Sequence, residues 1–165
     1  MPMFELWRAH SALRSGFAII TAALALALPS PGIAAASDGL RTIATSHRFP
    51  QVLERLEAAV NKHGLVVVAS ASASRGAAAR GVEIPGNAVV MVFRNDYAVR
   101  MLEASVPAGI EAPLRFYLTE NADGTASLSW RTPTSVFAPY GCAKLDEMAR
   151  ELDPLFEAIG RDASQ

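Results

Sequence analysis

The sequence predicts an α+β domain in which an antiparallel or mixed sheet carries helices on one face. Two segments, residues 46–62 and 144–159, repeat their apolar residues with the period of an amphipathic helix. Between them, residues 114–131 alternate apolar and polar side chains with the period of a strand, and a polar break divides them into a hairpin. Apolar helix faces and a half-apolar hairpin are typical of a two-layer fold, because each element buries its apolar side against the other.

The first elements are a strand and a helix. Residues 41–45 are expected to form a short strand, and Ser46 is the expected N-cap of a helix that runs to Lys62. Gly64 follows as the left-handed residue that commonly ends a helix. The apolar residues of this segment fall on one helix face, and they are Phe49, Val52, Leu53, Leu56 and Val60. We therefore expect the helix to lie on an apolar surface.

Two apolar strands with a short helical turn between them are expected next. Residues 65–70 and 88–93 are rich in β-branched side chains, which favour strands. The stretch 74–80 is alanine-rich and is followed by Gly81, so it is expected to form a short helical turn.

The second half of the chain is expected to contain a helix, a hairpin and a long final helix. Asn95 caps a helix over residues 96–105, which a proline and a glycine then stop. The hairpin strands are residues 114–119 and 125–131. Residues 144–159 form the last helix, with Pro154 inside it. The resulting order fits a sheet with helices on one face, and a ferredoxin-like arrangement of the same elements stays open.

The first 36 residues are typical of a secretory signal peptide. Arg8 and Arg14 make a positive start, residues 17–28 are an uninterrupted apolar run, and three alanines precede Ser37. A helix of this run covers only ~18 Å of a membrane core that is ~30 Å thick. We expect cleavage near Ser37 and a periplasmic or secreted domain, residues 37–165, with no membrane attachment afterwards.

The composition of this domain excludes several classes of partner. Removing Arg8, Arg14 and Glu5 from 15 Lys+Arg and 16 Asp+Glu leaves 13 and 15, so the net charge is about −2. No run of basic residues remains, which argues against nucleic acid and anionic membrane surfaces as partners. Cys142 is the only cysteine, so no internal disulfide can form. No group of residues has metal-ligand spacing, so we expect no metal and no cofactor.

The central strands are apolar on both faces, which predicts a homodimer. Helices on one face would leave an apolar strip on the other, and we expect it to contain Val66, Val68, Val90 and Val92. Such a strip is rarely left bare in a monomer, and a symmetric dimer is the commonest way to cover it. The helical turn at residues 74–80 is the alternative cover.

Five residues form a candidate ligand site. Arg94 stands at a strand end, Arg115 and Tyr117 on the polar face of the hairpin, and Arg131 on the neighbouring strand. Guanidinium groups and a phenol that converge on one face suit a carboxylate or phosphate group, and Glu111 is placed to orient one arginine. The alternative is that these charges form only a solvated surface.

Several short segments of the chain occur in an ordered series. They are Ser46-His47-Arg48-Phe49, Lys62-His63-Gly64-Leu65, Phe93-Arg94-Asn95-Asp96, Ala108 to Arg115, Glu120 to Gly124, Pro133 and Tyr140-Gly141. Over residues 46–160 their order and spacing resemble the domain of unknown function family numbered 302, many members of which carry a histidine where Tyr140 stands. The resemblance implies the β-α-β4-α layout of the TATA-binding-protein-like fold and a homodimer, and it implies no particular reaction.

The leading functional hypothesis is a non-catalytic, exported, dimeric module that binds a small anionic or amphipathic ligand. No local signature of a hydrolase, a phosphate loop or a nucleophile is present. The alternative is a small hydrolase or lyase that uses Glu111, Arg115 and Tyr117. A redox accessory protein that acts through Cys142 and Met91 or Met101 has the weakest support.

Overall fold

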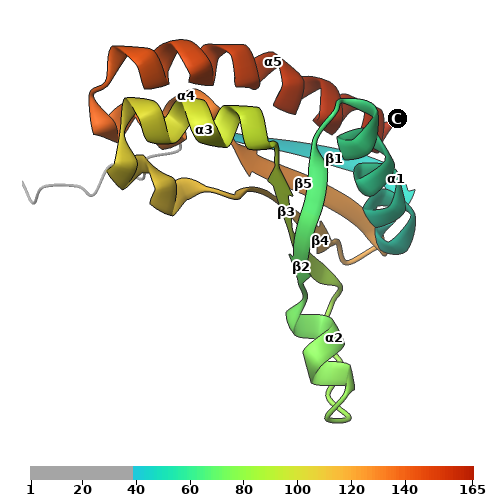
Figure 1. Cartoon of the computed structure of the whole chain (residues 1–165). Coiled ribbons are helices and arrows are strands. Elements are labelled where there is room, and N and C mark those ends of the chain that lie inside the picture. The colour runs from blue at the N-terminus through green and yellow to red at the C-terminus, as the bar shows by residue number, and fades with distance from the viewer. Residues whose placement is uncertain (1–38) are drawn as a thin grey trace, which may run out of the picture. The chain divides into compact units, whose positions relative to one another are not determined.

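The computed structural model describes residues 39–165, so the predicted signal peptide, residues 1–36, lies outside the described part of the chain. In chain order the elements are β1 (Leu40–Arg48), α1 (Phe49–Lys62), β2 (Val66–Ala71), α2 (Ala73–Ala78), β3 (Asn87–Phe93), α3 (Asn95–Ala104), the 3-10 helix η1 (Val106–Glu111), β4 (Leu114–Glu120), β5 (Thr125–Arg131), α4 (Pro133–Phe137), the 3-10 turn η2 (Ala138–Tyr140) and α5 (Ala143–Ser164). Figure 1 shows their arrangement.

The five strands form one sheet in the order β1-β5-β4-β3-β2, and every neighbouring pair is antiparallel. The α+β prediction is confirmed, and the sheet is antiparallel rather than mixed. The ferredoxin-like alternative is excluded, because that fold is a β-α-β-β-α-β arrangement and this chain places four strands between its two long helices.

The long helices α1 and α5 cover one face of the sheet, as Figure 1 shows. Their apolar stripes meet the inward side chains of the strands in one core, which includes Leu56, Phe116 and Phe156, all at most 1% exposed. Phe116 stacks on Phe156 with ring centroids 4.9 Å apart. Gly160 lets α5 approach the sheet closely, because a Cβ there would lie 2.6 Å from the Trp130 ring. We call this side of the sheet the covered face and the opposite side the open face.

The prediction that Val90 and Val92 lie on an uncovered face is wrong. Both belong to the core beneath the helices, where they are 0% and 2% exposed. Along β3 the other set of side chains, Val89 and Met91, faces away from the core and is half-buried. The sequence pattern could not separate the two sets, because both are apolar and either one satisfies a covered face.

An apolar strip does remain on the open face, with different members. Val66 and Val68 of β2 are 51% and 48% exposed. The register of β2 shifts between Val67, which pairs with Val92, and Ala69, which pairs with Met91, so that Val68 is an extra residue on β2. We define the apolar strip as Val66, Val68, Val89 and Met91.

The helical turn α2 does not cover the apolar strip, contrary to the alternative considered from the sequence. It lies at the far end of the β2–β3 hairpin, beyond the body of the sheet (Figure 1). Its residues Ser74, Arg75 and Ala78 line a hollow together with Phe49 and Leu53 of α1, which places α2 beside the start of that helix.

Two helix boundaries also differ from the prediction. Ser46 is not an N-cap, because β1 continues to Arg48, which pairs with Thr125 of β5 beyond a register shift. The helix begins instead at Phe49-Pro50, where a proline in the first turn is favourable, and the Gln51 side chain accepts a hydrogen bond from the Arg48 amide at 3.1 Å. The last helix runs past Ile159 to Ser164.

Candidate functional site

A hollow of about 470 Å³ lies between η1, the ends of β4 and β5, and the α4–η2 segment. Its charged residues are Glu111 at the end of η1, Arg115 at the start of β4 and Arg131 at the end of β5. The rest of the lining is mostly apolar and consists of Leu114, Ser135, Val136 and Pro139. Three of the five residues predicted from the sequence therefore share one site. We call it the two-arginine hollow.

The two arginines of the hollow lie next to each other on neighbouring strands. Phe116 pairs with Trp130, so Arg115 and Arg131, one position away on each strand, stand across from one another. Both are exposed, and within residues 39–165 neither forms an ion pair with a carboxylate. Like charges that face each other across a sheet are destabilising, so this pair favours a bound anion.

Glu111 is held by a tyrosine rather than by an arginine. The Tyr140 hydroxyl donates a hydrogen bond to Glu111 Oε1 at 2.9 Å. Burial and the hydrogen bond to Glu111, together with the negative charge of that residue, raise the pKa of Tyr140 above its ordinary value of 10.0. Tyr140 therefore stays protonated at neutral pH and continues to act as the donor. Glu111 was expected to orient an arginine, but no ion pair among residues 39–165 joins it to one.

Arg94 lies away from this hollow and already has partners. Its guanidinium makes two hydrogen bonds to Asp96, at 2.8 and 3.0 Å, and lies 4.2 Å from the centre of the Tyr97 ring. The hydrogen bond from Arg94 lowers the pKa of Asp96 below its ordinary value. The Asp96 carboxylate balances the positive charge of Arg94, so this guanidinium attracts an external anion less than an unpaired arginine does.

Tyr117 also lies outside the hollow. It sits on the open face of β4 between Val89 and Ser129, and it is 44% exposed. The hydrolase or lyase alternative needs Tyr117 beside Glu111 and Arg115, and among the lining residues of the hollow only the latter two are present.

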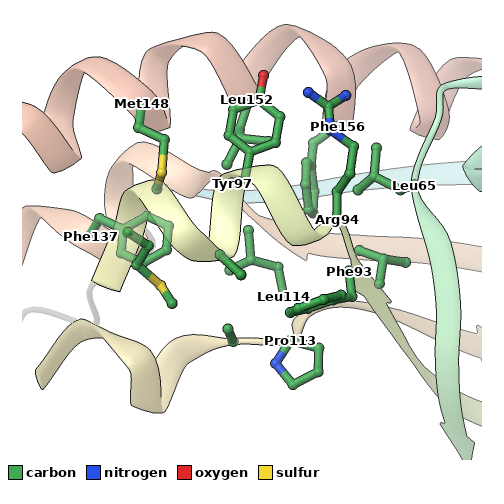
Figure 2. Close-up of a pocket in the computed structure, with 14 residues that line it drawn as sticks. Leu65, Phe93, Arg94, Tyr97, Pro113, Leu114, Phe137, Met148, Leu152 and Phe156 are labelled. Carbon is green, nitrogen blue, oxygen red and sulfur yellow. The ribbon is translucent and has the colours of Figure 1, made fainter. Parts of the chain in front are cut away.

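A second, narrower cavity of about 40 Å³ lies between β3, α3 and α5 (Figure 2). Its walls are mostly apolar and include Met101, Phe137 and Met148. Figure 2 shows Arg94 and Tyr97 side by side, extending from the start of α3 toward α5. A cavity of this size admits only one or two water-sized molecules, so we regard it as a packing gap rather than a ligand site.

Residues outside the predicted set contribute to the two-arginine hollow. Ser135, Val136 and Pro139 come from the α4–η2 segment, and Tyr140 reaches Glu111 across 29 residues of sequence. No spacing rule connects these positions, because they meet only through the packing of α4 and η2 against η1. The sequence pointed only to Tyr140, which stands where many members of the resembling family carry a histidine.

Other chemistry is limited in the described part of the chain. Among residues 39–165 no three His, Cys, Asp or Glu side chains lie close enough to hold a metal ion. None of the helices in this part is long and apolar enough to cross a membrane. Cys142 is half-buried before α5, and its thiol lies 3.6 Å from the Ala104 carbonyl oxygen.

The model of the family described as "Domain of unknown function DUF302" matches residues 41–159. The chain belongs to the DUF302 family. Among solved structures, the crystal structure of an uncharacterized conserved DUF302 protein from Bacillus stearothermophilus is similar, with a TM-score of 0.69 and 19% sequence identity. The match covers 77% of this chain and 99% of that one, and at this identity it shows a common fold. No curated protein matches the sequence.

Proposed function

We propose that this DUF302 domain is an exported, non-catalytic module that forms a homodimer and binds a small anionic or amphipathic ligand. The observation that carries the ligand proposal is the pair Arg115 and Arg131, which share one hollow and have no carboxylate partner within residues 39–165. Two neighbouring guanidinium groups suit a carboxylate or phosphate, which can accept hydrogen bonds from both. Leu114, Val136 and Pro139 supply apolar surface for the rest of an amphipathic ligand.

The homodimer is supported by the apolar strip on the open face. Val66 and Val68 are each about half exposed, and they belong to β2, an edge strand with no charged residue over Val66–Ala71. Edge strands of monomers are commonly protected by charge, so an uncharged and exposed edge favours association. Export is supported by the sequence of residues 1–36 alone. The intact mass of the exported protein tests this proposal, and we expect a mature N-terminus near Ser37.

The ligand proposal is tested by thermal melting with hexanoate, an amphipathic carboxylate, and with inorganic phosphate. We expect one of these anions to raise the melting temperature of the wild type, and Arg115→Ala and Arg131→Ala to weaken its binding about tenfold or more, since each removes a charge-assisted hydrogen bond of about 1.5–3 kcal/mol. Arg80→Ala is the matched control, because Arg80 is an exposed arginine that does not line the hollow. If all three variants weaken anion binding equally, the anion is held only by general charge attraction, and the proposed site is refuted.

A further inference from the structure

The two-arginine hollow contains charges of both signs that do not neutralise one another. Glu111, Arg115 and Arg131 all line it, yet no ion pair joins Glu111 to either arginine. In a small site, opposite charges that stay apart are each left to find a partner in water or in a ligand.

The carboxylate of Glu111 is oriented but not saturated. Tyr140 donates to Oε1 at 2.9 Å, and no described residue donates to Oε2. A carboxylate can accept about four hydrogen bonds, so Glu111 keeps capacity for a donor inside the hollow. Because the Tyr140 hydroxyl fixes the side chain, we regard Tyr140 as a positioning residue for this acceptor.

A ligand that carries only a negative charge would be repelled by the Glu111 carboxylate. Binding displaces water from the hollow, and the Glu111 carboxylate would then face a second negative charge with less solvent around it. A ligand with an ammonium group beside its carboxylate removes this penalty, since its positive group meets Glu111 while its negative group meets the arginines.

We propose that the two-arginine hollow binds a small zwitterion with an apolar side chain, of the class of free α-amino acids. The ligand's carboxylate contacts Arg115 and Arg131, its ammonium group contacts Glu111, and its apolar part lies against Val136 and Pro139. This assignment rests on the proposed function, because it takes the hollow as the ligand site and adds the second charge. The hollow, at about 470 Å³, has the size of a small-molecule site.

Three probes with nearly the same apolar group separate the two charges. L-leucine carries both, 4-methylpentanoate carries only the carboxylate, and 3-methylbutylamine carries only the ammonium group. Isothermal titration at neutral pH measures binding of each probe to the wild-type protein. We expect L-leucine to bind at least tenfold more tightly than either single-charge probe.

Variants of the hollow then identify which charge each side chain recognises. Glu111→Gln keeps an oxygen that can accept from Tyr140, and we expect it to weaken L-leucine at least tenfold while strengthening the binding of 4-methylpentanoate, because the repulsion between the two carboxylates is removed. Arg131→Ala should weaken both of these probes at least tenfold. Tyr140→Phe should weaken L-leucine but not 4-methylpentanoate, because it releases the carboxylate that meets the ammonium group. Glu147→Gln, an exposed carboxylate on α5, is the control and should change no affinity.

The outcomes distinguish this inference from the proposed function. If 4-methylpentanoate binds as tightly as L-leucine and Glu111→Gln alters neither, the zwitterion is refuted and an anion site remains. If none of the three probes binds at millimolar concentration, the zwitterion is also refuted, and the hexanoate and phosphate melts decide the anion site separately. Melting of each variant without a probe verifies that it is folded.

Discussion

Valines are buried on the covered face of the sheet but exposed to solvent on its open face. On the covered face, the valines Val90 and Val92 are buried beneath α1 and α5. On the open face, Val66 and Val68 of the neighbouring strand are about half exposed to solvent. The same residue type therefore stabilises the folded chain on one side and remains available for association on the other.

The arginines on the two sides differ in the same way. Arg100, on the helix side, forms two hydrogen bonds of 2.7 Å with Glu151 and so ties α3 to α5. Arg115 and Arg131, at the open face, have no carboxylate partner among residues 39–165. The open face thus carries both half-exposed valines and two neighbouring arginines without a carboxylate partner, and the proposed dimer and ligand site use these groups.

The largest expected effect comes from a charge placed on the covered face. Val90→Glu would bury a carboxylate among apolar side chains that offer it no partner, so the free energy of unfolding should fall by about 4 kcal/mol or more, or the variant should not fold. Urea unfolding followed by circular dichroism measures the loss. A loss below about 0.5 kcal/mol would mean that Val90 does not belong to the core.

The same substitution on the open face should act on association instead. Val68→Glu places its carboxylate at a half-exposed position, so we expect the stability of the monomer to change by less than about 0.5 kcal/mol. In the proposed homodimer it should raise the dissociation constant at least tenfold, or about 1.4 kcal/mol, because the charge would be desolvated in the interface. Light scattering over a dilution series measures this. A wild-type protein that is monomeric throughout would refute the dimer.

This contrast also explains how much of the fold could be predicted. The hairpin β4–β5 alternates Phe116 and Leu118 with Arg115 and Tyr117, so its two faces could be assigned correctly from sequence. In β3 both alternating sets are apolar, and the one that meets the helices is decided by the register with β4. Register is a tertiary property, which is why Val90 and Val92 were assigned to the wrong face.

The candidate site was predictable only where it follows strand periodicity. Arg115 and Arg131 could be placed on one face of a predicted hairpin. Arg94 could not be excluded from the site on sequence alone. Its bidentate partner Asp96 is also the kind of polar residue expected at the start of a helix, so the sequence did not reveal the pairing. The contact of Tyr140 with Glu111 depends on how η2 packs near η1, and residue spacing contains no information about that packing.

A smaller effect is expected from the ion pair on the helix side. The hydrogen bonds from Arg100 lower the pKa of Glu151 below its ordinary value. A lowered folded-state pKa contributes stability above the pKa of the unfolded chain, about 4.3, and this contribution is lost as the pH falls through the folded-state pKa. Glu151→Gln should therefore be less stable than wild type at pH 7, and the difference should shrink as the pH falls below about 4. Urea melts of both proteins across this range measure the difference, and a difference independent of pH would contradict the assignment.

The smallest effect concerns the two arginines of the hollow and has the opposite sign. Without ligand, Arg131 faces Arg115 across the β4–β5 pair, and like charges in this position destabilise a sheet. Arg131→Gln removes one charge while keeping most of the side-chain length, so it should raise the free energy of unfolding by about 0.2–1 kcal/mol at low ionic strength. The gain should disappear near ~1 M salt, where the Debye length is only about 3 Å. Arg41→Gln is the matched control, because Arg41 on β1 lies 3.5 Å from Glu157 and should lose stability when its charge is removed. If Arg131→Gln also loses stability at low salt, the charge of Arg131 is already balanced in the folded protein, and the case for an anionic ligand in the hollow fails with it.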